Sequence, residues 1–238
     1  MLLIGSISSS ASAQWNSYAH APIVPPKDTS TFLIFNDITA GPYFTAGISR
    51  QNEQIPQGWH SSSGFAYAIG AMGDFHINKW LGFTLGLLYD SRDLYLATTP
   101  GDSNSIDMSI GYIAIQPSVR IFWLLIGLAF DIPTAASATE IITHFTDRVS
   151  TTTTPYEQNM DVATNSLNTL TELHATLSAP IYKAESGEVN LIISASYPLS
   201  KTIRSTASFD TTGYFSQTGQ GPLPSIQAGI TYQFDLLH

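Results

Sequence analysis

The sequence predicts an all-β fold, an eight-stranded antiparallel up-and-down β-barrel that crosses a membrane. Three observations lead to this prediction: apolar and polar residues alternate along many segments, only 11% of the 238 residues are charged, and the connections between these segments are short and long in turn. Alternation with period two is typical of a strand with one apolar face, whereas a helix repeats its apolar positions every three or four residues.

The composition excludes several other classes of protein. A soluble globular domain usually carries about 25% charged residues, so 11% leaves too few for a solvated exterior. The absence of cysteine excludes disulfide bonds and thiolate metal sites. A net charge of −9 argues against nucleic-acid binding, which requires clustered Lys and Arg. The longest apolar run, Ile121 to Phe130, is too short for a transmembrane helix, which takes about 20 residues.

The N-terminal region is expected to precede the barrel. Residues 1–13 are apolar and serine-rich and end in the triplet Ala11-Ser12-Ala13, which is typical of a secretory cleavage site. No basic segment precedes them, so we expect a truncated signal peptide, with a serine-rich terminus as the alternative. Residues 14–37 contain several prolines and are expected to form a periplasmic linker. The barrel is assigned to residues 38–238.

We assign eight strands in chain order. The first two are 39–50 and 64–77, where Gly64, Gly70 and Gly73 would ease the curvature. In the third, 80–92, apolar residues from Leu81 to Tyr89 alternate with small or polar ones. The fourth, 106–122, changes its apolar face near Ile113, which predicts a β-bulge. The fifth, 124–132, is mostly apolar.

The last three strands alternate regularly. They are 168–182, 188–199 and 225–235, and their apolar faces run from Leu173 to Ile181, from Val189 to Tyr197 and from Ile226 to Phe234. Between the fifth and sixth strands, residues 135–145 are expected to form a short helix within a loop. The polar run 151–154 in the same loop has no reason to pack against the barrel.

The lengths of the connections alternate. Short turns are expected at 78–79, around Trp123 and at 183–187, and long polar loops at 51–63, 93–105, 133–167 and 200–224. An even number of strands with short turns at one end and long loops at the other is typical of outer-membrane barrels, whose long loops are extracellular and whose short turns are periplasmic.

The dimensions of the strands agree with a bilayer. At 3.3 Å per residue and a tilt of about 40°, the segment from Leu81 to Tyr89 rises about 20 Å, close to the apolar band of such barrels. Aromatic residues are predicted to form a girdle at each edge of this band. They are Trp80, Trp123, Tyr182 and Phe234 beside the short turns, and Tyr89, Tyr112 and Tyr197 toward the long loops.

Three segments carry a resemblance to a known family. Gly41–Ile48 (GPYFTAGI), Gly64–Asp90 and Ser225–Phe234 (SIQAGITYQF) are similar to strands of the small outer-membrane β-barrel domain family of Bacteroidota-like bacteria, akin to the barrel half of OmpA-like proteins. The resemblance implies a location in the bacterial outer membrane, contact with its lipids, and a C-terminal strand, 225–234, that the barrel-assembly machinery reads. The chain departs from the usual pattern because four residues follow Phe234.

The polar face of the strands predicts a network of side chains in the lumen. Its members are Asp74, His76, Asp90, Arg92, Glu172 and His174, while the suspected bulge leaves the facing of Arg120 open. We interpret them as ion pairs and hydrogen bonds, because an unpaired buried charge costs several kcal/mol. Asp74, His76, Glu172 and His174 are the only metal-site candidates worth testing. Strand spacing alone does not make a ligand set, so we expect neither a metal nor a cofactor.

One motif raises the question of catalysis. In outer-membrane lipid A esterases the catalytic His and Ser lie two residues apart, as in His60-Ser61-Ser62. A nucleophilic serine also needs a base in reach and a group that orients that base. The motif here falls in an expected loop with only Glu53 as a nearby acid, whereas those enzymes hold the pair on a strand. We therefore expect no catalytic residue.

These observations favour a non-enzymatic integral outer-membrane barrel with a structural or surface-recognition role through its extracellular loops. A narrow small-solute pore is the first alternative, and it requires more strands or a less filled lumen than expected here. An accessory barrel for envelope secretion or assembly is the second. A soluble carrier with the opposite assignment of faces is a further alternative, and an enzyme comes last.

Overall fold

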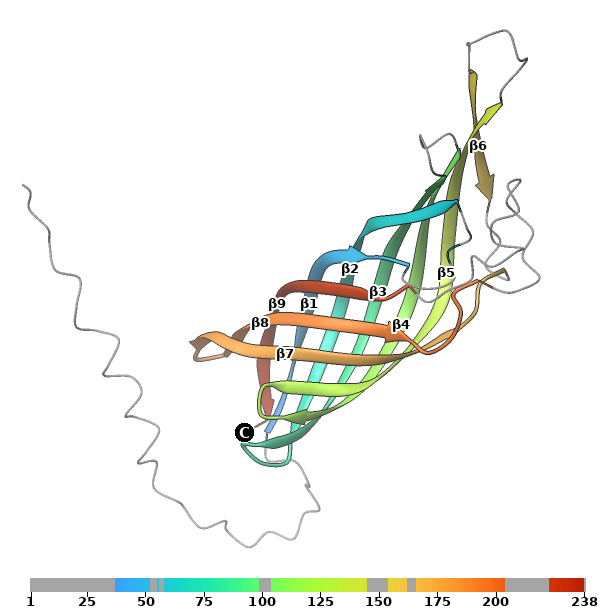
Figure 1. The fold of residues 1–238 in the computed structure, drawn as a ribbon. Helices are drawn as coiled ribbons and strands as arrows, with labels where there is room; N and C mark the ends of the chain where they lie inside the picture. The colour runs from blue at the N-terminus through green and yellow to red at the C-terminus, as the bar shows by residue number, and fades with distance from the viewer. Residues whose placement is uncertain are drawn as a thin grey trace, which may run out of the picture. The chain divides into compact units, whose positions relative to one another are not determined.

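A computed structural model describes residues 37–51, 55, 58–98, 104–144, 154–161, 166–203 and 223–237. The segments expected to be a signal peptide and most of the linker precede Asp37 and lie outside these residues. The strands are β1 (Asp37–Ser49), β2 (Trp59–His76), β3 (Leu81–Thr98), β4 (Asn104–Ile121), β5 (Leu124–His144), β6 (Thr154–Asp161), β7 (Leu170–Ala184), β8 (Gly187–Pro198) and β9 (Ser225–Leu237) (Figure 1). No helix in the described part of the chain is long and apolar enough to span a bilayer.

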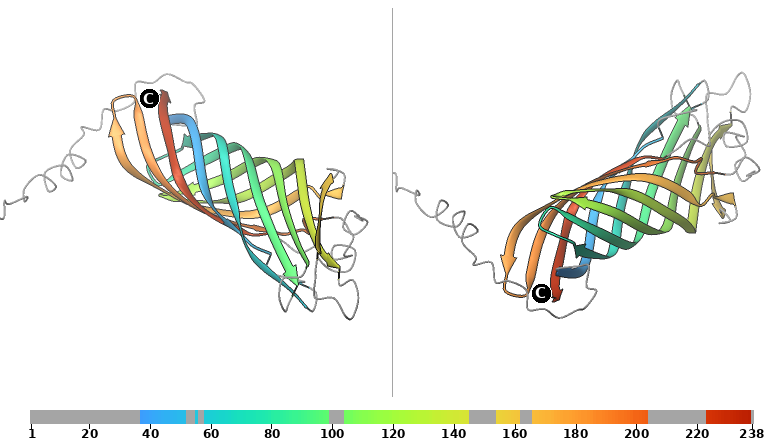
Figure 2. Two further views of the ribbon diagram at one scale, coloured as in Figure 1. Left: turned by 90° about the horizontal axis from the view of Figure 1, so that it is seen from above. Right: turned by 90° about the horizontal axis from the view of Figure 1, so that it is seen from below.

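Eight of the strands form a closed antiparallel ring. The order is β4-β3-β2-β1-β9-β8-β7-β5, and the β4–β5 pairing closes it. The first and last strands meet along most of their length, from Ile38 opposite Leu237 to Ser49 opposite Ser225. Their backbones approach closely there, and a Cβ at Gly229 would overlap the carbonyl oxygen of Phe44. The predicted eight-stranded up-and-down barrel is therefore confirmed, with tilted strands and the C-terminus at the end of the short turns (Figures 1 and 2).

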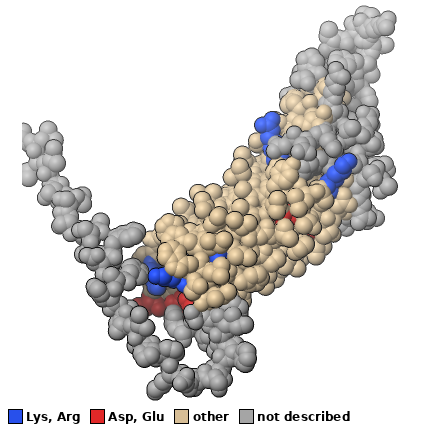
Figure 3. Space-filling view, turned by 60° about the horizontal axis from the view of Figure 1, so that its bottom comes forward, with Lys and Arg blue, Asp and Glu red and all other residues tan. Residues whose placement is uncertain are grey.

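Apolar side chains cover the outside of the ring in the half of the barrel that lies nearer the short turns. On β3, Leu81, Phe83, Leu85, Leu87 and Tyr89 point outward and are between 37% and 58% exposed. Polar residues line much of the inside, among them Thr39, Thr45, Thr84, Thr176, Asn190 and Gln233. They share it with a small apolar cluster of Tyr43, Ala68, Met72, Leu88, Ala114, Leu125 and Ile192. Charged side chains gather near the two ends of the face shown in Figure 3, and the wall between them is almost free of charge. In this architecture the outward apolar side chains face lipid, and the closed ring pairs the backbone hydrogen-bonding groups of neighbouring strands.

The polarity of the two faces reverses beyond Tyr89. On the outward face of β3 the next residues are Ser91 and Asp93, whereas the inward Leu94 and Leu96 join a buried apolar core. The reversal marks the edge of the apolar band. Beyond it the outside faces water and the inside holds a hydrophobic core, as in a soluble domain.

The same reversal explains the apparent change of face in β4. Ile110 and Tyr112 point inward and Ile113 and Ile115 outward in one unbroken alternation. The bulge expected in β4 is therefore wrong. The irregularity lies in the β4–β5 pairing between Gly111 and Tyr112, where β5 contains one residue more, Thr134. The apolar residues change face because the surroundings of each face change with height.

Three sequence predictions outside the apolar band are also wrong. Residues 135–144 do not form a helix but continue β5, and 154–161 form β6, which pairs antiparallel with the upper part of β5. β2 begins at Trp59, so His60-Ser61-Ser62 belongs to a strand. The end of β5 and the start of β2 are rich in Ser, Thr and Ala, and β6 consists mostly of polar residues. These stretches therefore lack the regular apolar alternation by which the other strands were recognised.

Candidate functional site

A buried ion-pair cluster surrounds Arg92 in the lumen. The Arg92 guanidinium donates from Nη1 to Glu172 Oε1 (2.5 Å) and from Nη2 to Glu172 Oε2 (2.8 Å), and its Nε donates to Asp90 Oδ2 (2.8 Å). A longer contact of 3.4 Å joins Nη2 to Asp131 Oδ2. The four side chains are at most 3% exposed. The cluster therefore ties β3, β5 and β7 together across the interior.

Negative charge outnumbers positive charge in this cluster. Three carboxylates, on Asp90, Asp131 and Glu172, face one guanidinium. Asp131 Oδ1 has no hydrogen-bond partner among the described residues. The Tyr112 ring lies 6.0 Å from the guanidinium carbon. Arg92 Nη1 also donates to the carbonyl oxygen of Leu223 (3.0 Å), which links the cluster to the chain just before β9.

A second ion pair lies near the short turns. Arg120 Nη1 donates to Asp74 Oδ2 at 2.7 Å, and Asp74 also accepts a hydrogen bond from the Thr84 hydroxyl. Arg120 Nε donates to the carbonyl oxygen of Phe122 (3.1 Å). Arg120 therefore faces the lumen, which settles the orientation that the sequence left open.

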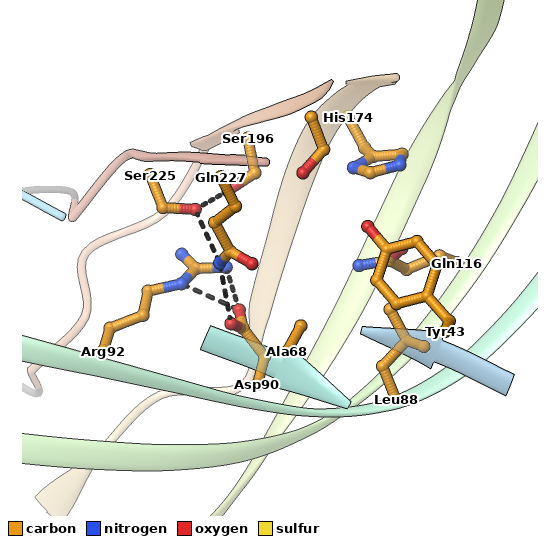
Figure 4. Close-up of a pocket in the computed structure, with 11 residues that line it drawn as sticks. Tyr43, Ala68, Leu88, Asp90, Arg92, Gln116, His174, Ser196, Ser225 and Gln227 are labelled. Carbon is orange, nitrogen blue, oxygen red and sulfur yellow. Dashed lines mark hydrogen bonds and ion pairs between the residues drawn. The ribbon is translucent and has the colours of Figure 1, made fainter. Parts of the chain in front are cut away.

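A small polar cavity lies next to the Arg92 cluster. Its volume is about 10 Å³, roughly the space of one water molecule. Arg92, Asp90 and Gln227 lie on one side of it, and His174, Tyr43 and Gln116 lie on the other (Figure 4). His174 Nε2 is 2.8 Å from the Thr176 hydroxyl. Side chains thus leave little free volume at this height of the barrel.

An apolar core fills the described part of the barrel mouth beyond the Arg92 cluster. It consists of Leu94, Leu96, Ile106, Met108, Ile110, Tyr112, Ala138, Leu167, Leu170, Ile203 and Leu223. Leu167, Ile203 and Leu223 come from segments between strands, and Leu167 forms a β-bridge with Ile203. The Asn168 side chain donates to the Lys201 carbonyl oxygen (2.8 Å) and holds the same two segments together. Parts of the long loops therefore close the mouth.

The candidate metal residues do not form one site. Asp74 pairs with Arg120 and Glu172 pairs with Arg92, in two separate groups. His174 bonds to Thr176, and His76 is half-buried at the end of β2. Within the described ranges no three His, Cys, Asp or Glu residues are arranged to hold a metal ion.

The predicted lumenal network is only partly one network. Asp90, Arg92 and Glu172 meet in the Arg92 cluster, Asp74 meets Arg120, and His174 lies across the small cavity. The sequence prediction missed Asp131 and the buried Glu140. Asp131 was detectable, because it continues the inward positions Leu125, Gly127 and Ala129 of β5 with period two.

The aromatic girdle needs one correction. Trp80, Trp123, Tyr182, Phe234, Tyr89 and Tyr197 are between 37% and 64% exposed on the outside of the barrel, where a girdle requires them. Tyr112 is fully buried instead and packs in the apolar core of the mouth. It lies above the point where the polarity of the faces reverses, so its aromatic ring points inward.

The motif His60-Ser61-Ser62 lies at the start of β2. Ser61 is buried, and the pleat places His60 and Ser62 on the opposite, outward face, across from Ala97 and Tyr95 of β3. The expectation of a loop is wrong for this motif. Glu53, the acid considered with it, lies outside the described residues.

The comparisons with known proteins give only distant similarity. No family model and no curated protein matches the sequence. Among solved structures, Ail, the attachment invasion locus protein of Yersinia pestis, in complex with the heparin analogue sucrose octasulfate, is 9% identical, with 83% of this chain and 98% of that chain covered and a TM-score of 0.35. The outer membrane protein OprG from Pseudomonas aeruginosa is 8% identical, with coverages of 85% and 96% and a TM-score of 0.34.

The closed ring, the lipid-facing exterior and the polar interior decide the class of this protein. The chain is an integral outer-membrane β-barrel. Strands cross a membrane only when their backbone groups are paired in such a ring. Short turns at one end and longer connections at the other are the arrangement found in bacterial outer membranes.

Proposed function

We propose that this protein is a non-enzymatic barrel that anchors a recognition surface outside the outer membrane. The observation that carries the proposal is the continuation of β2, β3, β4 and β5 beyond the apolar band, where they form a sheet with an apolar inner and a polar outer face. We call this part the extracellular sheet. It consists of residues 59–63, 91–98, 104–111 and 134–144, together with β6.

The outer face of the extracellular sheet supports a role in recognition. A hollow of about 330 Å³ opens on it, lined by Asp93, Asp107, Ser109, Ser137, Ala138 and Thr139. Partial burial, and then the nearby carboxylate of Asp93, raise the pKa of Asp107 above its ordinary value. The hollow is polar and acidic, which suits a ligand that donates hydrogen bonds or carries positive charge.

The β5–β6 hairpin is the second feature that supports recognition. It stands at the end of the barrel opposite the C-terminus (Figure 1). Within the described residues β6 pairs only with β5, from Ser137 opposite Asp161 to His144 opposite Thr154. An edge strand offers its backbone groups to an extended segment of a partner.

Two variants test this proposal. Ile141 pairs with Glu157, so the hairpin can be shortened by removing residues 142–156 and joining the ends through an Asn-Gly turn. Asp93→Asn combined with Asp107→Asn removes the charge of the hollow and leaves the strands intact. We expect cells that display the native barrel to aggregate or adhere to surfaces, and at least one variant to lose this property while both still assemble.

Assembly of each variant is checked by the gel mobility of the unboiled outer-membrane fraction. If both variants assemble and adhere as the native protein does, the extracellular sheet is not the recognition surface. Glu140 and the core of the mouth are retained in both variants, so a loss of adhesion does not result from an opened lumen.

We also propose that the barrel-assembly machinery reads β9. The ring of Tyr232, which is half-buried, and the exposed ring of Phe234 meet edge to face, with centroids 4.5 Å apart, near the end of this strand. Phe234→Ser should reduce the amount of assembled barrel several-fold in cells. Phe44→Ser is the matched control, since Phe44 is 48% and Phe234 46% exposed on the same outer surface. An equal loss from both variants would indicate lost lipid contact rather than lost recognition.

The relation to OmpA-like barrels of the Bacteroidota type remains part of the proposal. The segments that suggest it, Gly41–Ile48, Gly64–Asp90 and Ser225–Phe234, lie largely in the lipid-facing wall, whose alternation every such barrel requires. Related sequences that share the lumenal pair of Arg92 and Glu172 would support this relation, and related sequences without it would argue against it.

A further inference from the structure

Two neighbouring short turns bring three aromatic rings together on the outside of the barrel. The rings of Trp80, after β2, and Phe122, after β4, stack with centroids 5.1 Å apart, and Phe122 and Trp123 lie 4.2 Å apart. The backbone N–H of Phe122 donates to the carbonyl oxygen of Trp80 (2.7 Å) and joins the two turns. All three rings are exposed, by 56%, 41% and 44% in chain order.

The backbone of these turns is fixed in a conformation that places the rings. Phe122 has a φ of 60°, a left-handed conformation that a bulky residue rarely adopts. Such backbone conformations persist only where the surroundings hold them, and they concentrate at sites with a function. The Asn78 side chain accepts hydrogen bonds from the backbone N–H of Trp80 (2.8 Å) and of Leu81 (2.9 Å) and holds the first turn.

A cation accompanies the rings. Lys79 Nζ lies 5.4 Å from the centroid of the Trp80 ring, within the range of a cation–π contact. No carboxylate of the described residues forms an ion pair with Lys79, whereas Arg92 and Arg120 both have carboxylate partners in the lumen. The positive charge of Lys79 therefore remains available at the outer surface.

The rings continue the lipid-facing wall. Leu81 and Ile121, the residues at the adjoining ends of β3 and β4, pair with each other and are 40% and 52% exposed on the outside. Amphipathic rings at the end of an apolar band lie at the depth of the lipid headgroups. An ammonium group at this depth meets the phosphates of the same lipids.

We propose that Lys79, Trp80, Phe122 and Trp123, the aromatic turn patch, bind the headgroup of an anionic phospholipid in the periplasmic leaflet. The lipid phosphate pairs with the Lys79 ammonium, and the glycerol and first acyl carbons pack on the rings. A lipid fits better than a protein, because the patch is continuous with the apolar wall. The proposal rests on the orientation argued above, with the short turns in the periplasm, and goes beyond a girdle by naming a preferred lipid charge.

The test measures which lipids stay with the barrel. The full-length protein is inserted into nanodiscs of equimolar phosphatidylglycerol and phosphatidylcholine, and the retained lipids are counted by native mass spectrometry. We expect the native barrel to retain phosphatidylglycerol preferentially and Lys79→Gln to lower this preference about fivefold, the contribution of one Lys near a membrane surface. Lys183→Gln is the matched control, since Lys183 is exposed near the end of β7 but lies opposite the carboxylate-bearing Glu188 of β8, so its loss should change the preference much less than the loss of Lys79.

A second variant tests the role of the rings. Phe122→Gly suits the left-handed backbone and removes the ring between the two tryptophans, so it should lower the preference while the barrel still assembles. If this variant fails to assemble, Lys79→Gln decides the question alone. An unchanged preference in Lys79→Gln, or an equal decrease in Lys183→Gln, would overturn the proposal. Neither result bears on adhesion through the extracellular sheet, which is measured separately.

Discussion

Arg92 is the residue on which the interior of the barrel depends most. Its planar guanidinium engages both oxygens of Glu172 and one of Asp90 at the same time, which the single ammonium of a lysine cannot do in this geometry. Without it, three carboxylates would lie buried beside one another. The main role of Arg92 is therefore to compensate the negative charge of these three carboxylates, and the strength of any single ion pair matters less.

Replacing Arg92 tests this role. Arg92→Met should lower the free energy of unfolding by about 3–5 kcal/mol, the usual cost of removing one partner of a buried ion pair. Arg120→Met is the comparison. It should lower the free energy of unfolding by less, because it leaves only one carboxylate, that of Asp74, without its cation, and Asp74 keeps the hydrogen bond from Thr84. Urea unfolding in lipid vesicles, followed by tryptophan fluorescence, measures both. Equal losses would mean that the excess of carboxylates around Arg92 does not matter.

β4 shows how one element serves two environments. Its alternation is unbroken, yet its large buried apolar residues, from Ile106 to Tyr112, point into the barrel, and its exposed apolar residues, from Ile113 to Ile121, point outward. The pleat fixes only the period of two. Whether the inward or the outward set is apolar depends on whether lipid or water surrounds the wall at that height.

Polar substitutions along β4 test the reversal. Above the apolar band, Met108→Asp should destabilise the barrel by several kcal/mol, because it buries a charge in the core of the mouth. Ser109→Asp on the outward face should cost less than about 1 kcal/mol, the range of repulsion from a like charge on the neighbouring strand, here Asp93. Within the band, Ile115→Asp should cost about 2 kcal/mol in lipid, and Gln116→Asn should cost less, because it keeps an uncharged amide on the inward face. Unfolding free energies of the four variants provide the check. If the costly substitutions lay on the same face of β4 both above and within the apolar band, the assigned edge of the band would be wrong.

The whole molecule is a closed wall with a filled interior. Within the described residues, the Arg92 cluster, the ion pair of Asp74 with Arg120 and the apolar core of the mouth occupy successive heights of the lumen. Eight strands leave an interior that side chains can fill. Our proposal that the barrel holds a surface outside the membrane rests on this filled interior, whereas a small-solute pore requires an open one.

The closed, filled barrel predicts the outcome of two measurements on the intact protein. On detergent gels the unboiled protein should migrate differently from the boiled protein, because the folded barrel resists the detergent. In planar bilayers the same preparation should give flat current traces at high protein load. A mobility shift combined with defined conductance steps would favour the small-solute pore instead, and a soluble protein without a shift would reject the barrel.

The sequence alone determined the membrane strands and the ends at which short turns and long loops lie, because alternation and turn length are local properties of the chain. Eight of the strands in the structure correspond to the predicted segments, although the ends of several differ. The pairing of Arg92 with Glu172 depends on the register of three successive ladders, β3–β4, β4–β5 and β5–β7, and no local pattern reports it. The tertiary structure likewise decided that β5 continues to pair with β6. It also decided that Tyr112 is buried, because the face that a strand buries depends on its height relative to the bilayer.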